Sequence, residues 1–221
     1  MNDLVQQEIF EIEVLNWLKN KRFLPKLIFG GGTMLRLCHG LRRYSLDLDF
    51  WIYKIPQIEE FFQSLKDKLR KDFLMSDAQN KYYILLFEIT KNPYPQKLKI
   101  EIRKEIKEAD FQGKIAYSKY THRQVLLKGM TLEQMMQNKI KALLERKEIR
   151  DAFDIEFLIR SGMNLCLDRN MLNEMKKIIK GFKKNDYFVK LGSLLEPEAR
   201  EYYKKNKFDY LLQRINQKLS Y

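Results

Sequence analysis

Apolar residues recur at helical spacing in the first part of the chain. One such pattern predicts an amphipathic helix over residues 3–19 and consists of Leu4, Ile9, Ile12, Leu15 and Leu18. A second predicts a helix over residues 57–71. Between them a short apolar run ends in three glycines, and apolar residues at helical spacing follow, so we expect a turn and then a helix over residues 33–40.

Other segments alternate between apolar and polar residues, which is typical of strands. Residues 45–53 read SLDLDFWIY, with Leu46, Leu48 and Phe50 on one face and Asp47, Asp49 and Trp51 on the other. This pattern predicts a half-buried strand. Residues 82–90 and 98–103 predict two further strands, and the prolines between them suit a connection, so we expect an antiparallel pair.

The second half of the chain has a helical pattern. Thr131 and Gln134 resemble a capping box before a helix that runs to about Lys147. Another helix is expected over residues 150–159, ending near Ser161 and Gly162. We therefore predict an α+β fold in which residues 1–125 form a core with a mixed sheet and residues 126–221 form a mainly helical region.

Composition limits the class of protein. Apolar residues make up 45% of the chain, which excludes disorder as the main description. No window approaches 18 uncharged apolar residues, and the acidic N-terminus does not suit a signal peptide. We expect a soluble, cytoplasmic protein with no membrane partner. Cys38 and Cys166 lie far apart in sequence and outside any metal-binding motif, which argues against a disulfide scaffold and a zinc site.

The net charge of +13 makes a polyanionic partner the leading inference. The excess of positive charge is densest after residue 161, because residues 162–221 contain 13 Lys and Arg but only 7 Asp and Glu. A charged helical surface is usually only solvated, so this excess alone does not identify the partner.

Asp47 and Asp49 are the first candidate for chemistry. Side chains two residues apart on a strand project from the same face, so these carboxylates can hold one or two hard cations such as Mg²⁺. A solvated strand face is the alternative. The apolar neighbours weaken it, because unneutralised carboxylates there would repel one another and lose hydration.

A third carboxylate comes from the strand over residues 98–103. Glu101 alternates with Leu98, Ile100 and Ile102, as the two aspartates alternate with their own apolar neighbours. Glu88 is the rival, but its strand is apolar on both faces and alternation does not decide its orientation.

The glycine-rich turn is a candidate anion site. Backbone amides at a helix N-terminus bind anions, and Gly31, Gly32 and Thr33 fit that description. A simple tight turn is the alternative, and the lack of a following Gly-Lys-Ser/Thr excludes a Walker loop.

Lys139 falls within the apolar stripe of its predicted helix, so its ammonium must either reach the surface or meet an anion. Asp151 and Asp154 follow on one side of the next helix, close in sequence to Arg146. Ion pairs between the two helices would also explain this arrangement.

Four motifs together carry a family resemblance. They are Gly31-Gly32-Thr33, Arg43-Tyr-Ser45-Leu-Asp47-Leu-Asp49-Phe-Trp, Lys139-x-x-Ala-x-x-x-Arg146 and Arg150-Asp151-x-x-Asp154, with 13 residues between Thr33 and Asp47. In order and spacing the chain resembles the AbiEii/AbiGii-type toxin nucleotidyltransferases, which are relatives of DNA polymerase β. The resemblance covers about residues 29–158.

The resemblance implies Mg²⁺-dependent transfer of a nucleoside monophosphate from an NTP, with Mn²⁺ as a substitute metal. Asp47, Asp49 and Glu101 would hold the metal, although the glutamate departs from the aspartate common in the superfamily. The catalytic residues would be Asp47, Asp49, Lys139 and Asp154, with Asp151 as the alternative to Asp154. The nucleotide would be bound by Gly31, Gly32, Thr33, Arg43, Ser45, Arg146 and Asp151.

The resemblance also implies a toxin with a cognate antitoxin and an RNA acceptor, tRNA being the best-known target class. Transfer to a protein fits the same motifs. A non-catalytic module that binds NTP or RNA is the alternative from another functional class, and the retained aspartate pair argues against it.

Overall fold

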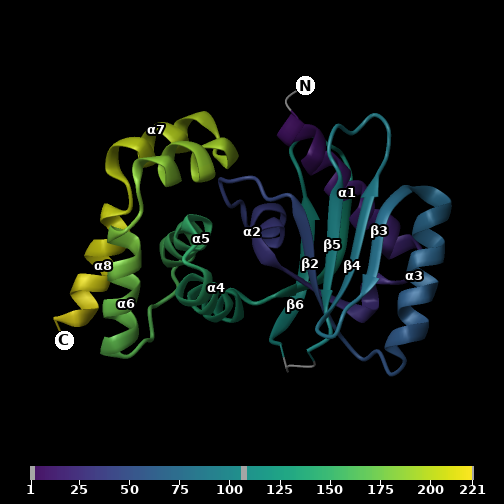
Figure 1. Cartoon of the computed structure of the whole chain (residues 1–221), viewed down its shortest axis with the longest axis horizontal. Coiled ribbons are helices and arrows are strands. Elements are labelled where there is room, and N and C mark those ends of the chain that lie inside the picture. Colours follow the sequence, from purple (N-terminus) through teal and green to yellow (C-terminus); the bar gives the residue numbers. More distant parts are fainter. Residues whose placement is uncertain (1–2, 106–108, 221) are drawn as a thin grey trace. The chain divides into compact units, whose positions relative to one another are not determined.

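The computed structural model describes residues 3–105 and 109–220, and it divides the chain into two compact units (Figure 1). The sheet unit extends to Gly40 and continues over Tyr44–Thr131, and the helical unit comprises Leu41–Arg43 and the chain from Leu132 onward. The division therefore falls after Thr131 and not after residue 125, because residues Gln124–Met130 form a strand of the sheet.

The sheet unit contains a mixed sheet. Its strand order is β3-β4-β5-β2-β1-β7-β6; β2 pairs with β5 and β1 with β7 in parallel, while the other neighbours are antiparallel. The strands are β1 (Leu27–Gly30), β2 (Asp47–Ile52), β3 (Leu74–Asn80), β4 (Ile84–Thr90), β5 (Leu98–Arg103), β6 (Phe111–Tyr117) and β7 (Gln124–Met130). The α+β class and the antiparallel pair predicted from the sequence are confirmed.

Helices cover the apolar side of this sheet. They are α1 (Asp3–Asn20), α2 (Gly31–His39) and α3 (Ile58–Asp72), and each matches a predicted helix. The rings of Phe62 on α3 and Phe87 on β4 lie 5.2 Å apart. Helix α1 differs from the amphipathic expectation, because it buries Val5, Phe10 and Val14 as well as the predicted Ile12, Leu15 and Leu18.

The other side of β2 and β5 is polar, and on β4 this side carries Glu88 and Thr90 together with Ile84 and Leu86. Along β2, buried Leu48, Phe50 and Ile52 alternate with half-buried Asp47, Asp49 and Trp51. The same alternation holds in β5, where Lys99 and Glu101 are half-buried and Arg103 is exposed. We call this side the polar face, and it positions the candidate site.

The helical unit contains α4 (Leu132–Arg146), α5 (Ile149–Arg160), α6 (Arg169–Lys180), α7 (Pro197–Asn206) and α8 (Asp209–Leu219). The first two confirm the predicted helices, and Gly162 takes φ 96° just beyond α5, as the predicted stop requires. Tyr187, Tyr203 and Phe208 form an aromatic core, with the rings of Tyr203 and Phe208 5.4 Å apart. Over the described residues, no helix is both long and apolar enough to cross a membrane.

Candidate functional site

Three carboxylates come together on the polar face of the sheet unit. Asp47 and Asp49 lie on β2, and the parallel register with β5 places Asp49 beside Glu101. All three side chains are half-buried, whereas the intervening Leu48 and Ile100 are fully buried. We call these three residues the carboxylate row. Its same-sign charges lie on rigid neighbouring strands, where they attract a cation.

The register also separates the two candidates for the third carboxylate. Glu88 on β4 pairs with Lys99 of β5, so it lies one strand farther from β2 than Glu101. Its carboxylate is 2.5 Å from the Lys97 ammonium and accepts a hydrogen bond from the Ser76 hydroxyl at 2.5 Å. This geometry favours Glu101 as the partner of Asp49, and Glu88 serves as the partner of a surface lysine.

The pKa of Lys99 reflects the negative charges of the carboxylate row. Its ammonium forms an ion pair with Glu101, and its pKa is raised by that bond first and then by the charges of Glu101, Asp47 and Asp49, against the opposing effect of burial. A positive charge at this point of the sheet is therefore favoured by all three carboxylates.

The glycine turn packs directly against the row. Gly31 has φ 73°, which favours glycine, and a Cβ atom there would lie 2.8 Å from the Cβ of Asp49. Gly30 is equally confined, because its Cβ would lie 2.6 Å from the Trp51 ring. Helix α2 begins at Gly31, so its N-terminal amides start beside the Asp49 carboxylate.

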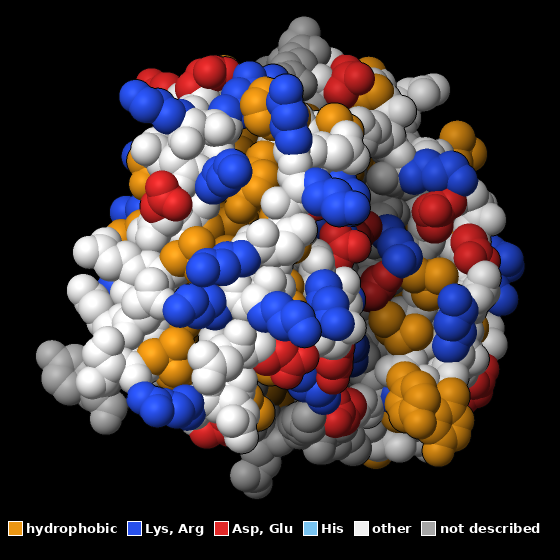
Figure 2. Space-filling model, turned by 60° about the vertical axis from the view of Figure 1, so that its left-hand side comes forward, with side chains coloured by type: hydrophobic (Ala, Val, Ile, Leu, Met, Phe, Trp, Pro, Cys, Tyr) orange, Lys and Arg blue, Asp and Glu red, His pale blue; other side chains and the backbone are white. Residues whose placement is uncertain are grey.

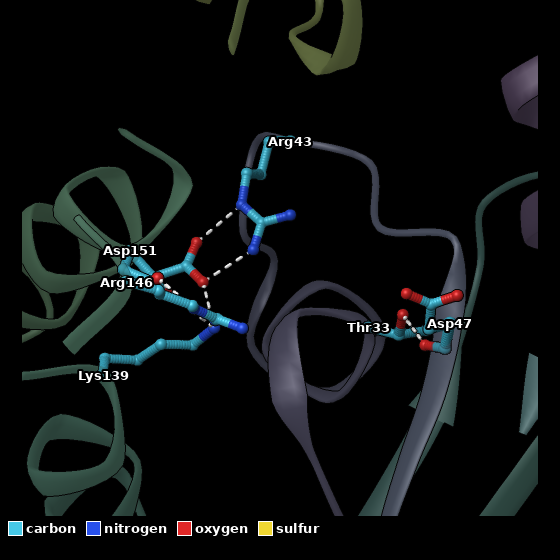
Figure 3. A network of polar contacts seen from close by, with 7 residues as sticks. Thr33, Arg43, Asp47, Lys139, Arg146 and Asp151 are labelled. Carbon is cyan, nitrogen blue, oxygen red and sulfur yellow. Dashed lines mark hydrogen bonds and ion pairs between the residues drawn. The ribbon is translucent and has the colours of Figure 1, made fainter. Parts of the chain in front are cut away.

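Thr33 joins the turn to β2. Its hydroxyl donates a hydrogen bond to the backbone carbonyl of Asp47 at 2.6 Å, and the residue is fully buried (Figure 3). The hydroxyl thus fixes the strand, and only the amide of Thr33 is left for the predicted anion site. Ser45 lies half-buried in the segment that leads into β2.

The chemistry of the row suits magnesium. Among the residues that the structure describes, no group of three or more His, Cys, Asp or Glu side chains is placed to hold a metal ion, so the row does not offer all three of its carboxylates to one ion. Mg²⁺ needs no such group, because it commonly binds one or two carboxylates and completes its shell with waters and substrate phosphates. Asp47 and Asp49 supply that minimum.

A second group of acids lies behind the row and was missed by the sequence analysis. Glu8 is buried and accepts hydrogen bonds from the Arg36 guanidinium and, at 2.5 Å, from the Ser118 hydroxyl. Glu11 is also buried, and neither of its carboxylate oxygens has a hydrogen-bond partner among the described residues. Burial, and then the charges of Glu8 and Asp47, raise the pKa of Glu11 well above its usual value, although Arg36 opposes the shift.

A signal for these acids was available in the sequence. Glu8 and Glu11 continue the three- and four-residue spacing of Leu4, Leu15 and Leu18 on the first helix. The same reasoning that singled out Lys139 on its apolar stripe would have found them.

In the helical unit, Lys139 is buried as predicted and meets anions. Its side chain is 9% exposed, and its ammonium lies 2.7 Å from Asp154 and 3.4 Å from Asp151. Both carboxylates belong to α5, so the ion pairs join α4 to α5. The interpretation as ion pairs between helices, which the sequence left open, therefore describes the observed contacts.

Two arginines complete this cluster (Figure 3). Arg43 donates to both Asp154 oxygens at 2.6 Å, and Arg146 donates to both Asp151 oxygens at 2.7 and 2.8 Å. Burial disfavours the Asp154 carboxylate, but Arg43 and Lys139 outweigh it, so the pKa of Asp154 is lowered. We call these five residues the ionic cluster, in which two fully buried carboxylates are matched by three cations.

Comparison with known proteins decides the family. A sequence model described as nucleotidyl transferase AbiEii toxin, type IV toxin–antitoxin system, matches residues 14–213. The chain belongs to the AbiEii family. It is thus a nucleotidyltransferase of a toxin–antitoxin family, which implies an NTP substrate and an antitoxin partner.

Solved structures agree with the AbiEii fold. The chain is similar to a putative nucleotidyltransferase from Helicobacter pylori, at 20% identity and a TM-score of 0.58 over 96% of each chain. It is similar to JHP933 from Helicobacter pylori, at 20% identity and a TM-score of 0.57 over 96% of this chain and 93% of that one.

A nucleotidyltransferase-like antigen from Paracoccidioides brasiliensis is 14% identical, with a TM-score of 0.51 over 95% of this chain and 93% of that one. At these identities the likeness concerns the fold alone. A sequence search of curated proteins gives no match.

Proposed function

We propose that the chain transfers a nucleoside monophosphate from an NTP to an RNA acceptor such as tRNA, in a Mg²⁺-dependent reaction. The acceptor hydroxyl oxygen would form a bond to the α-phosphorus, the bond between the α-phosphorus and the bridging oxygen of the β-phosphate would break, and pyrophosphate would leave. The observation that carries the proposal is the carboxylate row on the polar face, with the start of α2 packed against Asp49.

In this proposal the row does the central chemistry. Asp47 and Asp49 would hold Mg²⁺, which when bound would supply positive charge to neutralise the triphosphate and polarise the phosphorus. Glu101 lies beside Asp49 on the next strand, in a position to accept the proton of the acceptor hydroxyl. The raised pKa of Lys99 agrees with this choice of site, because after its bond to Glu101 the charges of Asp47 and Asp49 also favour the ammonium.

We assign triphosphate binding to the turn. The amides of Gly31, Gly32 and Thr33 head α2, where backbone N–H groups and the helix dipole favour an anion. Ser45 would add a hydroxyl from the segment before β2.

The ionic cluster supports a positioning role more strongly than direct chemistry. Asp154 engages Arg43 and Lys139, and Asp151 engages Lys139 and Arg146, so each carboxylate already carries two cations. Arg146 has a half-exposed side chain, and we propose it as the member of the cluster that contacts the nucleotide. Lys139 remains a predicted phosphate ligand. A Lys139→Met variant that folds and keeps full activity would exclude that role.

We propose that RNA supplies the acceptor because the chain is strongly basic. The net charge is +13, and Lys and Arg side chains are spread among acidic ones over the face drawn in Figure 2 instead of forming one block. Such a surface can follow a phosphate backbone with marked salt dependence.

Label transfer tests the proposal. The purified protein is incubated with Mg²⁺, total RNA and each NTP labelled at the α-phosphate. We expect label in RNA with one or a few NTPs, loss of transfer in Asp49→Ala, and full transfer in the control Asp67→Ala, which changes an exposed aspartate of α3. Salt-sensitive RNA binding without transfer would contradict it. Sequencing of RNA 3′ ends then identifies the acceptor and the added nucleotide.

A further inference from the structure

A second row of side chains follows the carboxylate row on the same polar face. Trp51 lies two residues beyond Asp49 on β2, and Arg103 lies two residues beyond Glu101 on β5. The register pairs Trp51 with Arg103, and the guanidinium is 5.2 Å from the indole ring. A flat aromatic ring and a cation therefore lie next to the three carboxylates.

The Trp51 ring is held in place from two directions. Its edge packs against Gly30, where a Cβ atom would lie only 2.6 Å from Cζ3, and Arg103 contacts it from β5. An indole confined in this way is a preformed surface for stacking, since little side-chain freedom remains to be lost when a base binds.

Aromatic and basic residues continue on both sides of this pair. The Lys128 ammonium lies 4.4 Å from the centre of the Tyr53 ring. The Phe111 ring contacts the Tyr53 ring edge-on, with 4.9 Å between the ring centres. On the other side, where β4 begins opposite Arg103, Tyr82 and Tyr83 are 84% and 76% exposed.

We call this set the aromatic–basic strip, and it comprises Trp51, Tyr53, Tyr82, Tyr83, Arg103 and Lys128. The rings of Tyr82 and Tyr83 lie 4.5 Å apart, so the two exposed tyrosines form one aromatic surface. Alternation of rings with cations is typical of surfaces that hold single-stranded nucleic acid, where bases stack and phosphates meet Lys or Arg.

We propose that the aromatic–basic strip binds the single-stranded 3′ end of the RNA acceptor, with a base on Trp51 and the adjoining phosphate on Arg103. This inference rests on the proposed function. Arg103 follows Glu101, the residue assigned to the acceptor hydroxyl, and this places the strip beside the acceptor side of the row. Because Trp51 also packs against Gly30 of the glycine turn, the base of the NTP is the competing occupant of the indole. A paired helix would not fit, because its bases are already stacked on one another.

Tryptophan fluorescence tests the contact. The chain has two tryptophans, and Trp17 lies in α1, where its ring stacks near Phe23. In a Trp17→Phe background Trp51 is the sole indole, and stacking of a base should quench it. We expect saturable quenching by a mixed-sequence 12-nucleotide RNA and none by a blunt RNA hairpin. Equal quenching by both, or quenching by NTP alone, would overturn the inference.

The Arg103→Gln variant provides a second test, which measures RNA affinity and its dependence on salt. We expect binding of the 12-nucleotide RNA to weaken about five- to twentyfold. The slope of log affinity against log salt should fall by about 0.7, as for one lost phosphate contact. The control is Lys68→Gln. It removes an exposed cation of α3 that lies 5.0 Å from the Phe23 ring, and it should change neither the RNA affinity nor its salt dependence.

Kinetics with total tRNA separate this inference from the proposed function, and they need no tryptophan variant. Arg103→Gln should raise the KM for tRNA several-fold and leave the KM for NTP unchanged. Normal transfer with an unchanged tRNA KM would overturn the strip alone. Quenching by RNA without any transfer would contradict the proposed function and leave the strip standing.

Discussion

The two acidic groups of the molecule differ in how their charge is balanced. In the ionic cluster, Asp151 and Asp154 are fully buried and each is bound by two cationic side chains. In the carboxylate row, three half-buried acids lie on neighbouring strands and raise the pKa of Lys99, and the lack of a side chain at Gly31 lets Asp49 pack against the start of α2. The cluster joins α4 to α5 through buried ion pairs, whereas the row gathers acids on one face of the sheet, so we expect the first to govern stability and the second to govern chemistry.

The largest expected effect on stability comes from the cluster. Asp154→Asn leaves Arg43 and Lys139 without their shared anion, and removing one partner of a buried ion pair costs about 3–5 kcal/mol. We expect this loss in urea unfolding at pH 7. Asp209→Asn, at an exposed aspartate of α8, is the control and should change the unfolding free energy by less than about 1 kcal/mol.

The pH dependence of this effect has a definite sign. The pKa of Asp154 is lower in the folded chain than in the unfolded one, so its contribution is complete above the unfolded value of about 3.9 and is lost as pH falls through the folded pKa. Asp154→Asn should lose this acid sensitivity. Identical acid unfolding curves for the two proteins would contradict the assignment.

Next in size is a comparison of two glutamates on the polar face. Glu101→Gln should lower transfer by about 100-fold, which is the lower range for loss of a general base. Glu88→Gln, one strand away and paired with Lys97, should stay within about twofold of wild type. Equal losses, or the larger loss at Glu88, would show that strand register has misidentified the third carboxylate.

Gly31→Ala tests whether the row depends on the glycine turn. The alanine would be strained at φ 73° and would overlap the Asp49 side chain, so we expect about 1–3 kcal/mol of destabilisation together with loss of transfer. Gly40→Ala is the matched control, since Gly40 also has positive φ, at 76°, but has open space around its Cβ position. Its cost should be smaller, and transfer should survive.

The smallest effect concerns Glu11. Its folded pKa is raised, so the folded chain retains a proton that the unfolded chain loses, and stability falls as pH rises from about 4.5 towards the folded pKa. Glu11→Gln cannot ionise, so its free energy of unfolding relative to that of wild type should increase as pH rises from 4 to 8. A constant difference across this range in urea unfolding would contradict the prediction.

Much of the fold could be predicted from periodicity, but the strands β1, β3, β6 and β7 were not predicted. β3 and β6 lie at the two edges of the sheet and are largely exposed, so neither strand shows a strict alternation of apolar and polar residues. β1 is a four-residue apolar run that ends in glycine, too short to be told from a loop by pattern alone.

The site was predictable where strand parity fixes a face, and uncertain where partners come from distant segments. Alternation placed Asp47, Asp49 and Glu101 on a face, but only the register between β2 and β5 made Glu101 the neighbour of Asp49. Burial of Lys139 followed from its helix. The partners of Lys139 could not be predicted, because the spacing of Asp151 and Asp154 allowed both phosphate binding and ion pairs. Arg43, which also binds Asp154, lies 111 positions away in the sequence.

The central claim is that chemistry belongs to the carboxylate row and stability to the ionic cluster. Its most direct test measures α-labelled NTP transfer and melting temperature for Asp49→Asn and Asp154→Asn side by side, at a temperature where both are folded. We predict that Asp49→Asn loses transfer by about 10³-fold or more with an unchanged or higher melting temperature, because a like charge is removed. Asp154→Asn should melt many degrees lower and keep measurable transfer. Retained transfer in Asp49→Asn, with loss confined to Asp154→Asn, would contradict the account.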